Sequence, residues 1–131
     1  MVEFAIVAPL LFLLIFGIID FGRALFLYNN LQDSARRAAR LAAVQLPDPC
    51  ASTALIQSSA RSYIREFNNS PSAASAVVNV TCTRDAAARV TRVSVQIANY
   101  PFRSLLPVPA LSNLRITQQA GVRFEGANPG S

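Results

Sequence analysis

The stretch VEFAIVAPLLFLLIFGIIDFGRALFLYNN, residues 2–30, decides how the chain is organised. It holds sixteen consecutive residues, 4–19, that carry no charge and almost no polar atom, with Glu3 just before them and Asp20 just after. A helix of that length covers about 24 Å, which is less than the hydrocarbon core of a bilayer, roughly 30 Å. The span becomes long enough if Asp20 and Arg23, three apart on one helical face, pair with each other and the following apolar residues extend it.

This apolar stretch has three interpretations. A secretory signal peptide begins with basic residues and ends at small ones, but Glu3 occupies the place of the basic start and helix-forming sequence continues beyond the apolar run. A transmembrane anchor is the second interpretation. The third is a helix that is surrounded first by lipid and later by other protein helices, because a helix that is apolar on every side requires apolar surroundings on every side.

Flanking charges and cysteines indicate opposite sides of the membrane for the remainder of the chain. Arg36, Arg37 and Arg40 follow the apolar run, and the positive-inside rule alone would keep them in the cytoplasm. Cys50 and Cys82 are the only cysteines and fit a disulfide formed in an oxidising compartment, with two buried free thiols as the alternative. The conflict disappears if a more basic leader preceded this sequence and was removed.

The helix is expected to continue, with a changed character, to about Gln45. Its second half carries an apolar stripe at helical spacing, formed by Leu31, Ala35, Ala38, Ala42 and Leu46. Asp33 is expected to pair with Arg36 or Arg37, which lie at helical spacing from it. The segment LPDP, residues 46–49, then stops the helix because proline cannot continue it. The whole helix is therefore about 65 Å long.

The remaining chain predicts a small head of one short helix and a three-stranded antiparallel sheet. Residues 51–69, ASTALIQSSARSYIREFNN, carry an apolar stripe at helical spacing, with Ser52 or Thr53 as the candidate N-cap. The stripe consists of Ile56, Ala60, Tyr63, Ile64 and Phe67. Three later runs alternate with a period of two, at residues 78–83, 92–97 and 116–124, which is typical of strands with one buried face. The fold class is therefore α+β.

Two further expectations concern the head. Cys82 shares the inward face of the first strand with Val78 and Val80, so a bond to Cys50 would tie the second helix to the sheet. The segment NYPFRSLLPVPALSN, residues 99–113, predicts a packed loop because it combines three prolines with large apolar residues. The bond between Tyr100 and Pro101, within it, is a candidate cis peptide, although trans is the default.

Composition gives little support for catalysis. The sequence has no His, no Cys/His cluster and no Gly-rich phosphate loop, and its seven acidic residues are scattered. The net charge of +5 reflects twelve arginines spread from Arg23 to Arg123, and no aromatic residues interleave those at 36–40. A generally basic surface is thus favoured over nucleic-acid binding. We expect no enzyme activity, no cofactor, no metal site and no nucleic-acid partner.

The N-terminal residues combine Val-Glu-Phe-Ala, an apolar run with an early proline, an Asp-Phe-Gly-Arg segment and an Ala/Arg-rich helix. The individual positions are Val2, Glu3, Phe4, Ala5, Pro9, Asp20, Phe21, Gly22 and Arg23. As a set they resemble TadE-like proteins, pilin-type subunits of the tight-adherence branch of type IV pili. Residues 93–109 and 116–125 are also similar to the closing segments of that family. In the family the glutamate usually lies further from the cleavage site than Glu3 lies from Met1, so either two residues upstream are missing or the cut is shifted.

The resemblance implies a pilin-like fold and a structural role as a subunit of a type IV-like (Tad-type) pilus filament. Residues 1–30 would form the membrane and filament-core helix, and residues 31–131 its amphipathic continuation with the head. The subunit would insert in the bacterial inner membrane with its head in the periplasm and then join an extracellular filament involved in cell adhesion. Its partners would be copies of itself in a helical homopolymer, other pilins, the prepilin peptidase, an assembly ATPase and an outer-membrane pore, as in a secretion system.

The residues expected to carry assembly lie along the first half of the helix. They are Glu3, Phe4, Pro9, Leu10, Leu11, Leu14, Ile18, Asp20 and Arg23. From the resemblance, Glu3 is expected near the N-terminal amine of a neighbouring subunit or of its own chain. Two alternatives to the main filament subunit stay open: a minor pseudopilin that primes or tips a filament, and a membrane-anchored binding head that never polymerises.

Overall fold

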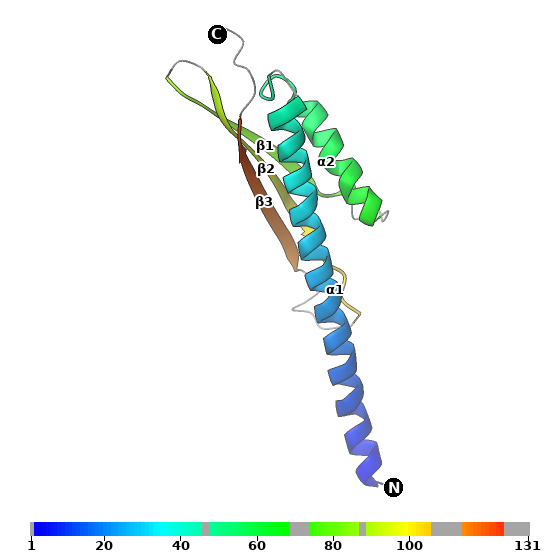
Figure 1. Ribbon diagram of the computed structural model, residues 1–131. Helices are drawn as coiled ribbons and strands as arrows, with labels where there is room; N and C mark the ends of the chain where they lie inside the picture. Colours follow the sequence, from blue (N-terminus) through cyan, green and yellow to red (C-terminus); the bar gives the residue numbers. More distant parts are fainter. Residues whose placement is uncertain (1, 46–47, 69–73, 87–88, 106–113, 125–131) are drawn as a thin grey trace.

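The computed structural model describes residues 2–45, 48–68, 74–86, 89–105 and 114–124. One long helix runs the length of the molecule and projects beyond a small head (Figure 1). In the head, a second helix and a three-stranded sheet pack against the C-terminal half of the long helix. The expected α+β architecture is therefore confirmed.

Helix α1 (Val2–Gln45) has 44 residues, ends where the sequence predicts, and continues through Pro9. Its C-terminal half packs through small residues with no exposed surface, namely Ala35, Ala38, Ala39 and Ala42. Because an alanine side chain ends at Cβ, the sheet and the second helix can both approach the backbone of α1 closely. Leu31 extends this buried stripe towards the N-terminus, whereas Leu46 lies outside the described residues.

Helix α2 (Thr53–Phe67) packs on α1 and confirms the predicted short helix. Its buried residues are Ile56, Ala60 and Ile64. Ser52, one of the two predicted N-cap residues, takes the N-cap position, but with φ −102° and ψ 29° it makes no side-chain capping hydrogen bond. A capping hydroxyl normally requires extended backbone at that residue. Asp48 arranges the turn instead, because its Oδ1 accepts the backbone N–H groups of Cys50 at 3.0 Å and Ala51 at 3.4 Å.

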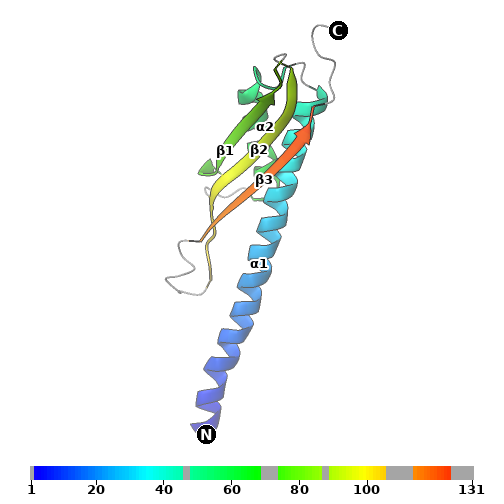
Figure 2. The ribbon, with the colours of Figure 1, turned by 90° about the vertical axis from the view of Figure 1, so that its left-hand side faces the viewer.

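Strands β1 (Val77–Arg84), β2 (Val90–Pro101) and β3 (Arg115–Arg123) form an antiparallel sheet in the order β1-β2-β3. Helix α1 packs against β2 and β3, and α2 packs against β1. Figure 2 looks onto the opposite face, which no helix covers. The predicted alternation is confirmed, since the buried strand residues include Val78, Val93, Val95, Ile97, Ile116, Gln118 and Ala120.

Strand β2 runs further than the sequence predicts. Residues 99–101 belong to the strand rather than to a loop, and Tyr100 is only 1% exposed. A register shift between Ile97 and Tyr100, with Asn99 at φ 59°, marks a β-bulge. The extra residue reverses the alternation, so Tyr100 enters the core where strict alternation would place Asn99. The bond before Pro101 is trans, as expected, and residues 106–113 of the predicted loop lie outside the described residues.

Candidate functional site

Among the described residues, most of the exposed large apolar side chains lie on the N-terminal half of α1. Residues 4–19 project beyond the head, and Phe4 and Leu10 are 78% and 71% exposed (Figure 1). Within the described residues, α1 is the one helix long and apolar enough to cross a membrane. An exposed apolar surface of this extent marks a contact with lipid or with another protein.

Seven of the predicted assembly residues lie on this projecting half, and all are exposed. They are Glu3, Phe4, Pro9, Leu10, Leu11, Leu14 and Ile18. No ion pair involves Glu3 among the described residues, and Met1, which carries the amine, lies outside them. A Cβ added at Gly17 or Gly22 would meet nothing within 4 Å. These glycines are therefore not required for packing against the described residues of their own chain.

Asp20 and Arg23, the other two predicted assembly residues, meet where α1 enters the head. Nη1 of Arg23 lies 3.7 Å from Oδ1 of Asp20, which confirms the predicted pair. The backbone N–H of Leu105 also donates to both oxygens of Asp20, at 3.0 Å each. With this cover Asp20 is only 5% exposed. The sequence gives no signal for the Leu105 contact, because the two residues are 85 positions apart.

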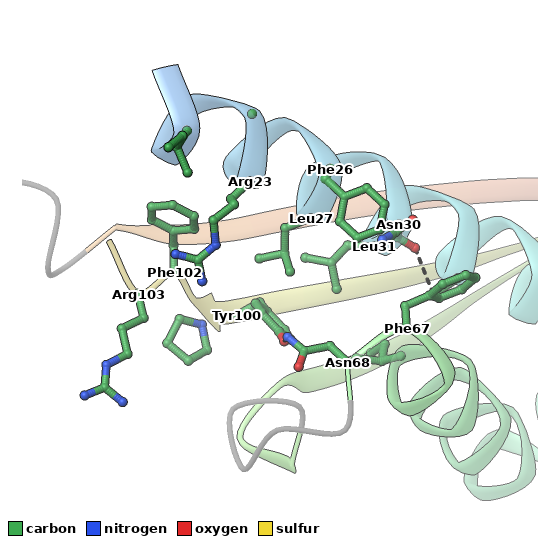
Figure 3. Close-up of a pocket in the computed structure, with 15 residues that line it drawn as sticks. Arg23, Phe26, Leu27, Asn30, Leu31, Phe67, Asn68, Tyr100, Phe102 and Arg103 are labelled. Carbon is green, nitrogen blue, oxygen red and sulfur yellow. Dashed lines mark hydrogen bonds between the residues drawn. The ribbon is translucent and has the colours of Figure 1, made fainter. Parts of the chain in front are cut away.

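A groove of about 690 Å³ opens just above this contact, between α1, the end of α2 and the end of β2. Figure 3 shows Phe26, Leu27 and Leu31 of α1 facing Phe67 and Tyr100 across it. This groove was not predicted, since its walls come from three segments that are distant in sequence. It joins the exposed apolar half of α1 to the interior of the head.

Polar contacts lie at the side of the groove that the end of α2 and the end of β2 form. Nδ2 of Asn68 donates to the phenol oxygen of Tyr100 at 2.7 Å, which links the end of α2 to the bulged part of β2. Nε of Arg37 lies 2.8 Å from Oδ2 of Asp33, so one of the two predicted pairings of that aspartate is confirmed. The guanidinium of Arg37 also lies 5.8 Å from the ring centroid of Phe67. The Asn68 contact thus links the end of α2 to β2, and the Arg37 contact links α1 to α2 beside the groove.

The two cysteines lie side by side as free thiols. Cys82 is half-buried on the inward face of β1, as the alternation predicts. Burial and a hydrogen bond with Cys50 raise the pKa of the Cys82 thiol to about 12. The fold thus brings Cys50, in the turn before α2, next to Cys82 of β1. The disulfide between them stays a prediction.

The arrangement offers surfaces for contact rather than an evident site for a reaction. Within the described ranges, no group of three or more His, Cys, Asp or Glu residues could hold a metal ion. Ion pairs among the described residues lie within α1, as Asp20–Arg23 and Asp33–Arg37, or join β1 to the turn before α2, where Arg84 lies 3.5 Å from Asp48.

A long exposed apolar helix that carries a small α+β head defines a pilin-like protein able to anchor in a membrane. Residues 1–40 match the family model described as TadE-like protein, so the resemblance seen in the N-terminal residues is confirmed. The match covers the exposed half of α1 and most of its buried half. No curated protein and no solved structure matches the chain. The matched family is one of structural pilus components.

Proposed function

We propose that this protein is a structural subunit of a Tad-type pilus filament, inserted in the inner membrane and then polymerised through α1. The observation that carries the proposal is the exposure of most of residues 4–19, which project beyond the described part of the head. Burial of a large apolar side chain contributes about 1.5–3 kcal/mol, so this helix has a strong preference for surroundings that the chain itself does not supply.

The two environments succeed one another in the proposed life of the subunit. Lipid surrounds residues 4–19 before assembly, and α1 helices of neighbouring subunits surround them afterwards. The ion pair of Asp20 with Arg23 lies where the apolar segment ends. Because each charge keeps its partner, the pair limits the free-energy cost of moving this end of the segment from a bilayer surface into a protein bundle. The heads then lie outside a bundle of parallel helices.

Glu3 is the one acid in the projecting half and needs a cation once that half is enclosed. We propose that the N-terminal amine of a neighbouring subunit, or of the same chain, supplies it. Glu3→Ala then reduces filament formation while the head stays folded, because Glu3 is in the first turn of α1 and that end of α1 lies far from the head (Figure 1). Assembly of Glu3→Ala at the normal rate would exclude this role.

The proposal places the head in the periplasm before assembly and on an extracellular filament after it. A prepilin peptidase, an assembly ATPase, an outer-membrane pore and other pilins are the partners that this route requires. The position of the subunit in extracted filaments distinguishes two roles: labelling along the length indicates the main subunit, and labelling at the ends indicates a minor one that primes or tips the filament.

Photo-crosslinking tests the central contact. A photoreactive amino acid at Leu14, which is 56% exposed on the projecting half, is activated in extracted filaments and in membranes of cells that cannot assemble them. The same group at Thr81, exposed on the uncovered face of the sheet, is the matched control. We expect subunit–subunit adducts from Leu14 in filaments and lipid adducts in membranes. Lipid adducts alone from every sample would show that the chain is a membrane-anchored head that does not polymerise.

A further inference from the structure

The uncovered face of the sheet carries two arginines that stand directly opposite each other. Arg92 of β2 and Arg123 of β3 are paired in the antiparallel register, and both are exposed. Their neighbours in the strands, Val93 and Val122, point towards the helices, so the two arginines point away from them. Opposed residues on one face have Cβ atoms about 4.5–5.5 Å apart, and like charges in that position are destabilising.

No carboxylate of the described residues offsets this repulsion. The ion pairs of the described chain use Arg23, Arg37 and Arg84, and neither Arg92 nor Arg123 takes part in one. Arg92 is near the start of β2 and Arg123 ends β3, and these strand ends lie at the end of the head furthest from the N-terminus of α1 (Figure 2). They therefore stay open to solvent when the apolar half of α1 lies in a membrane.

The two arginines border a shallow, open polar hollow. The hollow measures about 760 Å³ and is completed by Ser94, Gln119 and Gly121. Gly121 faces Ser94 across the strands, and a Cβ added to it would lie 3.0 Å from the Ser94 hydroxyl oxygen. Glycine at this position leaves the hydroxyl accessible from the hollow.

We propose that this hollow binds an oxyanion, a phosphate or sulfate group, between the guanidinium groups of Arg92 and Arg123. A guanidinium presents several N–H donors in a planar fork that fits two oxygens of one oxyanion. A tetrahedral oxyanion has further oxygens for a second fork and for a hydroxyl such as that of Ser94. The bound group also replaces the repulsion between the two arginines by attraction to both.

The thermal stability of the full chain in neutral detergent tests the site. Near-ultraviolet circular dichroism of the tyrosines follows unfolding of the head at low ionic strength, with millimolar phosphate, sulfate or chloride matched in ionic strength. Phosphate and sulfate are expected to raise the unfolding midpoint by roughly 4 °C over chloride. This is the shift expected for a domain of this size when the anion concentration is about ten times a millimolar dissociation constant. Equal midpoints in all three salts would exclude the site.

The variants separate this site from general salt effects. Arg123→Gln and Arg92→Gln are each expected to abolish the phosphate and sulfate increment, while the midpoint without these anions stays unchanged or rises because the repulsion is gone. Arg115→Gln is the matched control, since Arg115 is exposed on the same face of β3 but stands opposite Pro101. An increment that survives in Arg123→Gln would overturn the proposal.

A second arm identifies the source of the anion. The detergent-solubilised chain is passed over dextran sulfate and over unmodified dextran. Retention on dextran sulfate that Arg123→Gln loses and Arg115→Gln keeps shows that the site accepts sulfate groups carried by a polymer. A thermal shift without such retention restricts the ligand to the free ion. Loss of retention in Arg115→Gln to the same degree would show that net charge, rather than the hollow, is responsible.

Discussion

Removal of the Asp20 carboxylate is expected to release the segment after β2 from α1. Both oxygens of Asp20 accept the backbone N–H of Leu105 at 3.0 Å, and Asp20 is 5% exposed. A hydrogen bond to a charged acceptor contributes about 1.5–3 kcal/mol, against about 0.5–1.5 kcal/mol for a neutral one. Asp20→Asn should therefore destabilise this contact by about 1 kcal/mol, and Asp20→Ala, which leaves the N–H without an acceptor, by about 1–3 kcal/mol.

Amide hydrogen exchange measures this free energy at the residue concerned. Exchange through local opening accelerates tenfold for each ~1.4 kcal/mol of local destabilisation. The Leu105 amide is therefore expected to exchange about fivefold faster in Asp20→Asn and roughly five- to 150-fold faster in Asp20→Ala. The Val95 amide, in the central strand, should keep its rate because the core is untouched.

The control variant is Arg23→Gln, which removes the cation and keeps the carboxylate. Arg23 lies 3.7 Å from Asp20 and its side chain is 51% exposed, so this pair contributes only about 0–1 kcal/mol. Exchange at Leu105 should change less in Arg23→Gln than in Asp20→Ala. An unchanged Leu105 rate in Asp20→Ala, or an equal effect of both variants, would show that the carboxylate does not hold the segment.

Four further predictions concern the head. Ala38→Leu should lower its stability by about 1–3 kcal/mol, measured by thermal unfolding, because Ala38 has no exposed surface and added methylenes overpack the contact; an unchanged midpoint would show that α1 does not approach its neighbours closely. Tyr100→Phe should lower the free energy of unfolding by about 1 kcal/mol, because it removes the hydrogen bond from Asn68. Equal unfolding midpoints of the variant and the wild type would contradict this prediction. In the reduced chain, the raised pKa of Cys82 favours the protonated thiol of the folded state. Stability is thus complete below about pH 9 and declines as the pH rises towards 12, a decline that Cys82→Ala should remove. Oxidation of Cys50 and Cys82 to a disulfide should raise the free energy of unfolding by about 3–4 kcal/mol, by the chain-entropy relation. Failure of mild oxidants to join the two thiols in the folded chain would contradict this prediction.

Sequence periodicity predicts most of the secondary structure because each element has a local signal. The apolar run and the alanine stripe identify α1, and the segment at 46–49 explains its end at Gln45. The alternation of two identifies all three strands and the inward position of Cys82. The pair of Asp20 with Arg23 is also local, since it spans one helical turn.

The bulge in β2 shows where local pattern fails. The alternation of Val93, Val95 and Ile97 predicts Asn99 inside, but the core instead takes Tyr100 after the chain inserts one residue. A tyrosine ring buries far more apolar surface than an asparagine side chain, and the phenol finds a partner in Asn68 only after α2 and β2 have met. The same reasoning applies to Ser52, whose capping role depends on a backbone conformation that the turn around Asp48 decides.

The sequence by itself determines that residues 4–19 require apolar surroundings, because no side of that helix is polar. It also supplies the N-terminal residues that match the TadE-like family. Only the tertiary structure decides that the described part of the head leaves this segment uncovered. It also decides that the backbone N–H of Leu105 donates to Asp20 and that Arg92 lies opposite Arg123. The physical reason is distance along the chain: helical and strand periodicity act over a few residues, whereas these contacts join segments that only the packed sheet and helices bring together.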